Sequence, residues 1–271
     1  MLTIDPNPRV TFGVRFEDEH LLVVEKPARV PTQPGKGHAA DTLLNGLFAR
    51  YGAQLQNLGK ARDFGLLHRL DRETSGLLII ALRPAAYDAL RRSFETRRIR
   101  KFYWAICDGH PRDSSGVIKL AIAESDRQEG GGPQKLARIS RTGKPSITAY
   151  RVLSRSEAAS LIEARPITGR LHQVRVHLDA IGCPILGDDF YGPRKVQGAS
   201  PRLALHAHRI QFPHPITGEP VDVRSDWPKD LKRLVKNLRL NAAVPADPPS
   251  APEDPALSDL TDPASDSPDE S

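Results

Sequence analysis

The densest group of side chains that could carry out chemistry lies in residues 67–76, LHRLDRETSG, directly before a continuous apolar run. A charged loop delivered by a buried strand is a common way to hold a reactive group rigidly. Asp71 lies close in sequence to Arg69 and Arg72, two cations that would favour its ionised form if they converge in space. The alternative is a turn in which Asp71 and Thr74 bond the local backbone. These ten residues leave both interpretations open.

A second group lies in residues 166–177, PITGRLHQVRVH. If this segment is helical, Leu171, Val174 and Leu178 form one apolar face. Arg175 then lies beside that face, where a cation can be held close to the core and paired with a buried carboxylate. The alternative is an ordinary helix whose arginine extends along the apolar face to reach solvent. The pattern favours neither interpretation.

Two histidines, His206 and His208, alternate along a third segment, residues 203–210, and so lie on one face of a strand. Such a pair can bind a metal, but no carboxylate or cysteine follows at a recognised ligand spacing. His172 and His177 are five residues apart rather than the four that put two ligands on one helix face. We therefore predict hydrogen-bonding core histidines and no metal site.

The sequence also lacks three familiar signatures of nucleotide and hydrolase chemistry. It contains no Walker phosphate loop, no dinucleotide-binding glycine fingerprint and no Gly-x-Ser-x-Gly elbow. These absences argue against nucleotide-driven chemistry and against an α/β-hydrolase.

Charge is divided unevenly along the chain. All 39 Lys and Arg residues precede Asn241, whereas eight of the 33 acidic residues lie from that position onward, so residues 1–240 carry +14 and residues 241–271 carry −8. Such a basic body indicates a polyanionic partner, with nucleic acid the first candidate and an anionic membrane surface the second. A run of cations fits either a solvated helix face or a phosphate-binding surface: Arg91, Arg92, Arg97, Arg98, Arg100 and Lys101.

Several classes of protein are excluded by what the chain lacks. No apolar run approaches the roughly 18 residues needed to cross a bilayer, and the first residues lack the apolar segment of a signal peptide. The two cysteines, Cys107 and Cys183, are too few for a disulfide framework, although one disulfide between them stays open. We expect a cytoplasmic protein that does not bind membranes and acts as a monomer.

Strand and helix signals alternate irregularly, without an internal repeat. Residues 14–16 and 21–25 should form a hairpin, and residues 147–153 should pair with 160–164. Further strands are expected at residues 76–82, 101–107, 117–123 and 202–212, and helices at residues 41–50 (capped by Asp41), 84–98, 171–181 and 228–238. The lack of regular alternation predicts an α+β fold, with a mixed, mostly antiparallel sheet flanked by helices.

We expect the chain to divide into three parts: an N-terminal arm of residues 1–15, one folded domain of residues 16–240, and an acidic tail of residues 241–271. The tail has seven prolines and only three large apolar side chains. Such a segment cannot bury enough surface to offset its ordering entropy, so we expect it to be disordered.

Six blocks, taken in order, resemble the RluA-type pseudouridine synthase family. The similarity spans residues 16–225. The blocks are DEHLLVVEKP (18–27), HRLD followed by TSG (68–76), KFY (101–103), GKP followed by TAY (143–150), GRLHQVR (169–175), and LHA followed by HPITGE (205–219). Two departures, Glu25 where the family usually has Asn and His208 after the last histidine block, do not touch the catalytic positions.

This resemblance implies a pseudouridine synthase catalytic fold and a cofactor-independent isomerisation of uridine in structured ribosomal or transfer RNA. It implies that Asp71 is the essential carboxylate, that Tyr103 stacks on the target base, and that Arg175 pairs with Asp71. Arg69 would enter the space left by the flipped nucleotide. Further RNA-binding positions are His68, Thr74, Arg170 and His172. Choice of target is expected to come from loops such as residues 126–144.

Two other functions are compatible with parts of the sequence. The first is an RNA-binding protein that no longer catalyses, against which the presence of Asp71, Tyr103 and Arg175 argues. The second is a metal-dependent hydrolase that uses His206 and His208.

Overall fold

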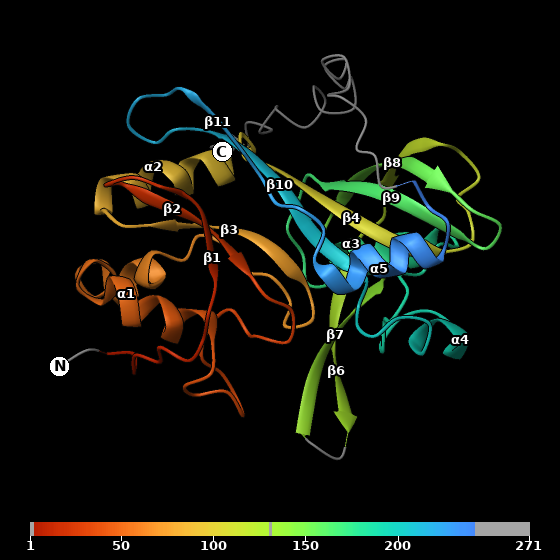
Figure 1. Cartoon of the computed structure of the whole chain (residues 1–271), viewed down its shortest axis with the longest axis horizontal. Helices are drawn as coiled ribbons and strands as arrows, with labels where there is room; N and C mark the ends of the chain where they lie inside the picture. The colour runs from red at the N-terminus through yellow and green to blue at the C-terminus, as the bar shows by residue number, and fades with distance from the viewer. Residues whose placement is uncertain (1–2, 130–131, 242–271) are drawn as a thin grey trace, which may run out of the picture.

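The computed structural model describes residues 3–129 and 132–241 of the chain (Figure 1). The acidic tail, apart from Asn241, lies outside these residues, so its disorder stays a prediction. No helix in the described part is long and apolar enough to cross a membrane. Cys107 and Cys183 are buried and not joined in a disulfide.

A nine-stranded sheet forms the centre of the described fold, in the order β1-β2-β3-β10-β4-β9-β8-β5, with β11 paired to β10. Its neighbouring strands are antiparallel except β3 and β10, which are parallel. The strands are β1 (Gly13–Glu17), β2 (Leu21–Lys26), β3 (Ser75–Ala81), β4 (Arg100–Asp108), β5 (Ser115–Lys119), β8 (Ile147–Arg155), β9 (Ala159–Pro166), β10 (Leu205–Pro213) and β11 (Pro220–Arg224). The predicted α+β fold with a mixed, mostly antiparallel sheet is confirmed.

Helices flank this sheet. The described helices are α1 (Leu43–Leu58), the 3₁₀-helix η1 (Lys60–Gly65), α2 (Pro84–Glu95), α3 (Gln173–Ala180), α4 (Arg194–Gln197) and α5 (Lys229–Asn237). Helix α2 contacts β3, and α3 contacts β8 and β9. Figure 1 shows α5 crossing in front of the central strands β10 and β4.

Strand β3 is buried along its whole length and is paired on both sides, with β2 and with β10. A strand covered on both faces is encoded by a continuous apolar run rather than by alternation, which is why its position could be predicted. Its parallel contact with β10 consists of two registered pairs, His206 with Ser75 and Ala207 with Gly76. Ala207 in turn pairs with Tyr103 of β4, so the start of β3 lies in one row with Tyr103.

Gly76 is required for this row. Its φ is +125°, a conformation that side chains rarely adopt, and a Cβ at this position would lie 2.3 Å from the Ala207 carbonyl oxygen. The missing side chain therefore lets β3 approach β10 closely enough to pair.

Several predicted boundaries were wrong. Helix α1 is capped by Thr42 rather than Asp41, because Thr42 and Asn45 satisfy each other's backbone groups in a capping box, and the helix continues to Leu58. Helix α2 ends at Glu95 instead of residue 98. Helix α3 begins at Gln173 instead of residue 171, because the preceding residue, His172, has a left-handed backbone conformation.

The strand predicted at residues 117–123 is two strands. β5 pairs with β8, whereas β6 (Ile122–Glu129) leaves the main sheet and forms a hairpin with β7 (Gly132–Ile139). The stretch 126–144, which we expected to be a loop, therefore contains a β-hairpin, which projects from the body in Figure 1. Gly143 packs against the start of β6, where the chain leaves the main sheet. A Cβ at Gly143 would lie 2.4 Å from the carbonyl carbon of Ile122, so this close packing requires glycine.

The N-terminal segment packs on the domain. The Asn7 N–H donates to the Asn45 carbonyl (2.9 Å), and the sheet begins at Gly13, inside the segment assigned to the arm.

We predict that Gly76→Ala lowers the free energy of unfolding by about 3 kcal/mol or more, since the new methyl group overlaps the β10 backbone and the φ value is strained. The matched control is Gly35→Ala, an exposed position where a Cβ meets nothing within 4 Å. Urea denaturation of both variants checks this. Equal midpoints for the two variants would show that the close approach at Gly76 is not needed.

Candidate active site

A cleft of about 630 Å³ opens beside the start of β3. Most of its walls come from four parts of the chain: the loop before β3, the end of α2, the start of β4, and residues 166–175. Glu124, Lys144 and Leu205 complete the lining. The charged residues that line it are Arg69, Asp71, Glu95, Arg97, Lys101, Glu124, Lys144, Arg170 and Arg175. Cations therefore outnumber carboxylates in the lining, as a site for a polyanion requires.

The loop that carries Asp71 is held on both sides of that residue. Leu70 exchanges two hydrogen bonds with the Thr32 hydroxyl, which accepts from the Leu70 N–H (3.2 Å) and donates to its carbonyl (2.9 Å). The Arg72 carbonyl accepts from the Arg29 N–H (2.7 Å) and from Lys26 Nζ (3.2 Å). These contacts fix the backbone around Asp71 while leaving its carboxylate facing the cleft.

Lys26 is buried, and its ammonium also donates to the carbonyls of Pro27 (2.9 Å) and Val30 (2.7 Å). Burial lowers the pKa of Lys26 to about 7, although Asp71 and Glu73 favour its charged form. Lys26 thus has a positioning role, since its side chain donates to three backbone carbonyls and so links the loop after β2 to the Asp71 loop.

The turn in the Asp71 loop is formed by the backbone and not by side chains as the alternative expected: the Thr74 N–H donates to the Asp71 backbone carbonyl (3.1 Å). The Asp71 side chain contributes nothing to it; that carboxylate contacts Arg175 Nη1 (3.4 Å) and lies 3.9 Å from His172 Nε2. Thr74 is 2% exposed, and within the described residues its hydroxyl has no hydrogen-bond partner.

Arg175 is paired with a buried carboxylate, and the alternative of an arginine reaching solvent is wrong. Its main partner is Asp188, which accepts from Nε (2.8 Å) and Nη2 (2.7 Å) in a two-pronged contact. Both side chains are nearly inaccessible, at 4% and 1% exposure. Burial acts to lower the pKa of Arg175, but the Asp188 carboxylate outweighs it and holds that pKa above its usual range. Asp188 was missed in the sequence; its signal is an acid that follows the apolar pair Ile185 and Leu186 after one glycine.

His172 closes the Asp71 side of the cleft. Its Nδ1 lies 2.8 Å from the Tyr191 hydroxyl, which also accepts the Ala137 N–H (2.9 Å), and its ring stacks on Phe190. Burial lowers the pKa of His172, an effect that the neighbouring Asp71 only partly opposes. A neutral His172 bonded in this way directs its Nε2 edge toward Asp71.

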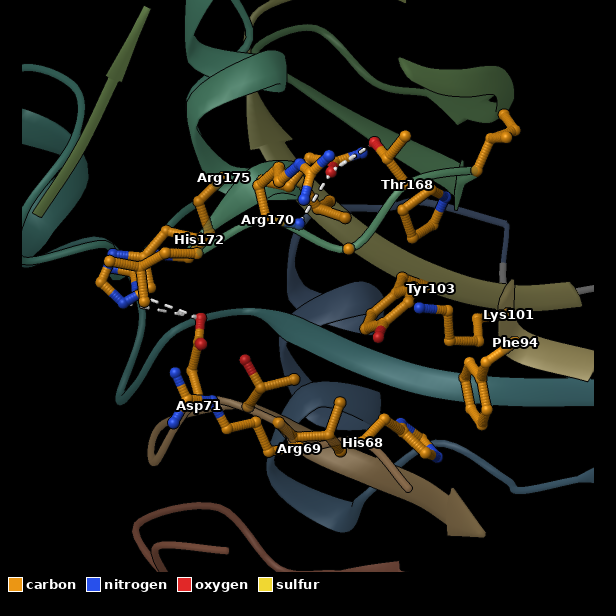
Figure 2. A pocket seen from close by; sticks show the side chains of 18 of the residues that line it. His68, Arg69, Asp71, Phe94, Lys101, Tyr103, Thr168, Arg170, His172 and Arg175 are labelled. Atoms are coloured by element: carbon orange, nitrogen blue, oxygen red, sulfur yellow. Dashed lines mark hydrogen bonds and ion pairs between the residues drawn. The ribbon is translucent and has the colours of Figure 1, made fainter. Parts of the chain in front are cut away.

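The other end of the cleft is aromatic. Figure 2 shows Tyr103 between Asp71 and Lys101, with Phe94 beyond Lys101. Tyr103 is 8% exposed, and burial, reinforced by Asp71, raises the pKa of its hydroxyl, which therefore stays protonated. His68 turns away from Asp71 toward β3, where its Nε2 accepts the Ile79 N–H (3.0 Å). Burial lowers the pKa of His68 to about 3, so the ring is neutral.

Arg69 and Arg170 line the same cleft with exposed side chains. The segment that carries Arg170 is held by Gln173, a second residue that sequence reasoning missed. The Gln173 side chain accepts from the Arg170 N–H (3.0 Å) and donates to the Ile147 carbonyl (2.9 Å). All eight residues predicted to contact RNA or catalyse thus line one cleft: His68, Arg69, Asp71, Thr74, Tyr103, Arg170, His172 and Arg175.

His206 and His208 lie outside this cleft and are core residues, as predicted. His206 bonds the hydroxyls of Ser75 (2.9 Å) and Ser225 (3.2 Å), and His208 bonds Glu163 (3.1 Å) and stacks on Trp104. In the described part of the chain, no cluster of three or more His, Cys, Asp or Glu residues is arranged to hold a metal ion.

Comparisons with known proteins agree with this geometry. Residues 20–180 match the RNA pseudouridylate synthase family. The ribosomal large subunit pseudouridine synthase D of Zymomonas mobilis is 41% identical over 240 residues, covering 86% of this chain and 74% of that protein. Synthase C of Vibrio vulnificus is 34% identical over 232 residues, covering 83% and 68%. The solved structure of human RNA pseudouridylate synthase domain containing 4 has a TM-score of 0.66 at 29% identity, covering 84% of this chain and 94% of that one.

Fold, cleft and relatives together define an RNA-modifying isomerase. More narrowly, the chain belongs to the RluA-type RNA pseudouridine synthases, as its ordered sequence blocks predicted.

We predict that Asp188→Ala lowers the free energy of unfolding by about 3 kcal/mol, because it leaves the buried Arg175 guanidinium without its main counter-charge. The matched control is the adjacent, exposed Asp189→Ala, which should change stability by less than about 0.5 kcal/mol. Urea denaturation followed by circular dichroism measures both. Similar losses in the two variants would contradict the importance of the Arg175–Asp188 pair.

Proposed function

We propose that this enzyme converts uridine to pseudouridine in large-subunit ribosomal RNA without a cofactor, and that Asp71 is its catalytic carboxylate. The observation that carries the proposal is the position of Asp71: a half-exposed carboxylate at one end of a basic cleft, between a fixed guanidinium and an aromatic ring. Membership in the pseudouridine synthase family supplies the reaction class.

The reaction matches this small set of groups. The N1–C1′ bond of uridine must break, the uracil must turn, and C5 must bond to C1′ while a proton leaves C5. Atoms are rearranged without net oxidation or hydrolysis, so a single carboxylate is sufficient. Asp71 either attacks C1′ or removes the C2′ proton to give a glycal. Arg175 Nη1 at 3.4 Å supports either role, since it can hold the carboxylate in place.

The target base must leave its stack to reach Asp71, at a cost of a few kcal/mol. The Tyr103 ring offers a surface on which the flipped uracil can stack, and Arg69, two residues before Asp71, is exposed and free to fill the vacated space. Exposed cations at the rim, among them Arg97, Lys144 and Arg170, suit the phosphates of the surrounding strand.

We propose ribosomal RNA as the substrate because of the names of two relatives. The Zymomonas mobilis and Vibrio vulnificus proteins are both named as synthases of the ribosomal large subunit. Mapping pseudouridines in total RNA from a deletion strain against its parent tests this choice. Loss of a site in large-subunit ribosomal RNA supports it, whereas loss confined to transfer RNA overturns it.

We predict that Asp71→Asn lowers tritium release from RNA containing C5-tritiated uridine at least about 1000-fold, because the amide can neither attack C1′ nor remove a proton. RNA affinity, measured by filter binding, should stay close to that of the wild type. The control is Glu73→Gln, which removes the same charge from the same loop and should keep normal turnover. Wild-type turnover by Asp71→Asn would show that another group carries the reaction.

A further inference from the structure

Lys101 is a cation in the lining of the cleft that has no polar partner among the residues that the structure describes. It stands two residues before Tyr103 on β4, so the two side chains lie on the same face of the sheet. Within residues 3–129 and 132–241, its ammonium makes no hydrogen bond and no ion pair, and it lies over the Phe94 ring, 5.8 Å from the ring centre. Gly169 lies close to it: a Cβ there would be 3.8 Å from Nζ.

Two buried cations near the site, unlike Lys101, have hydrogen-bond partners among the described residues. Arg175 has two bonds to Asp188, and Lys26 donates to three carbonyls. The partly buried Lys101 keeps three N–H donors for water or a ligand, and burial lowers its pKa to about 8. A charge held in a cleft without a partner is a cost to the folded protein, and such groups cluster at functional sites.

The position of Lys101 relative to Asp71 would place its ammonium near a carbonyl oxygen of the bound uracil. Figure 2 shows Asp71 on one side of Tyr103 and Lys101 on the other, with Nζ directed toward the Tyr103 ring. If uracil stacks on Tyr103 with its sugar at Asp71, the ring atom farthest from C1′ points toward Lys101. In uridine the atom opposite N1 is C4, which carries O4. In pseudouridine the atom opposite C5 is C2, which carries O2. Substrate and product thus both present a carbonyl oxygen on the Lys101 side.

The same oxygens receive charge during the reaction. When the N1–C1′ bond breaks, its electron pair stays on uracil, where the negative charge is shared among N1, O2 and O4. This holds whether Asp71 attacks C1′ or removes the C2′ proton. A preorganised cation aimed at developing charge is among the strongest catalytic devices in a partly dehydrated site.

We propose that Lys101 is a catalytic residue that donates a hydrogen bond to the uracil carbonyl opposite the glycosidic bond and stabilises the uracil anion as that bond breaks. The inference rests on the proposed function, since it requires uracil on Tyr103 with its sugar at Asp71. With this role, Lys101 would act on the uracil base, whereas Asp71 would act on the sugar.

The test uses the full-length enzyme in excess over a large-subunit ribosomal RNA transcript made with C5-tritiated uridine. Lys101→Met removes the ammonium and keeps the length of the side chain; it should lower the single-turnover rate on the order of 100-fold. The matched control is Lys119→Met, an exposed lysine at the end of β5 that is not part of the cleft lining, which should leave the saturated rate unchanged.

Two readouts separate catalysis from a structural role. Removing an unpaired, partly buried charge should leave the urea midpoint of Lys101→Met equal to or above that of the wild type, whereas a structural lysine would lower it. The saturated wild-type rate should fall as pH rises through about 8, when Lys101 loses its proton, and Lys101→Arg should not show this fall.

The titratable and charged groups that line the cleft with Lys101 allow this pH comparison. They are His68 from the loop before β3, Glu95 and Arg97 from the end of α2, Tyr103 on β4, and Arg170 from the segment before α3, together with Asp71, Glu124, Lys144, His172 and Arg175. Burial lowers the pKa of His68 and raises that of Tyr103, so neither changes charge near pH 8. Lys26 titrates near pH 7, but wild type and Lys101→Arg share that step.

The outcomes distinguish this inference from the proposed function. A wild-type saturated rate in Lys101→Met, with Asp71→Asn inactive, overturns the role of Lys101 and leaves the function intact. Absence of tritium release by the wild type from ribosomal and from total cellular RNA overturns the proposed function itself. A slow Lys101→Met with a lowered urea midpoint, and an Arg variant with the wild-type pH profile, also overturns the catalytic role.

Discussion

The contact between β3 and β10 is the constraint on which the rest of the site depends. Two registered residue pairs join a portion of the sheet built from the first third of the chain to a portion built from the remainder. Asp71 belongs to the first portion, whereas Tyr103 and Arg175 belong to the second. Because Gly76 has no side chain, the backbones meet at a distance that brings the Asp71 loop to the edge of the cleft. Without that approach, the carboxylate and its neighbours would belong to separate surfaces.

The main ion pair of Arg175 is formed with Asp188, so Asp71 makes only one, longer contact with that guanidinium. Asp188 takes the Nε and one terminal nitrogen of Arg175, leaving Nη1 for Asp71 at the longer distance of 3.4 Å. The guanidinium therefore behaves as a fixed donor whose charge is already balanced. A carboxylate held in this way keeps its orientation and stays available for reaction, which a tight two-pronged pair would prevent.

The sequence was most informative where one local pattern determined the structure. The apolar run before residue 82 predicted a buried strand directly after the Asp71 loop, and β3 is that strand. It was least informative where tertiary contacts decided between local options. The backbone of His172 shortened α3, and the close packing of Gly143 on Ile122 turned one expected strand into two. A buried carboxylate beside Arg175 was one of two interpretations that the sequence left open, and its identity as Asp188 was not predicted, because no spacing rule links an arginine to an acid thirteen residues later.

The pairing of Ser75 with His206 joins positions 131 residues apart. Contacts between such distant segments close a long loop, and folds that depend on them fold more slowly. During synthesis, β10 must leave the ribosome before β3 can acquire its second neighbour, so a chain cut short before residue 205 has the Asp71 motif but cannot complete the cleft. The geometry of the site thus depends on the polypeptide being synthesised past β10: a shorter copy contains Asp71 without the cleft around it.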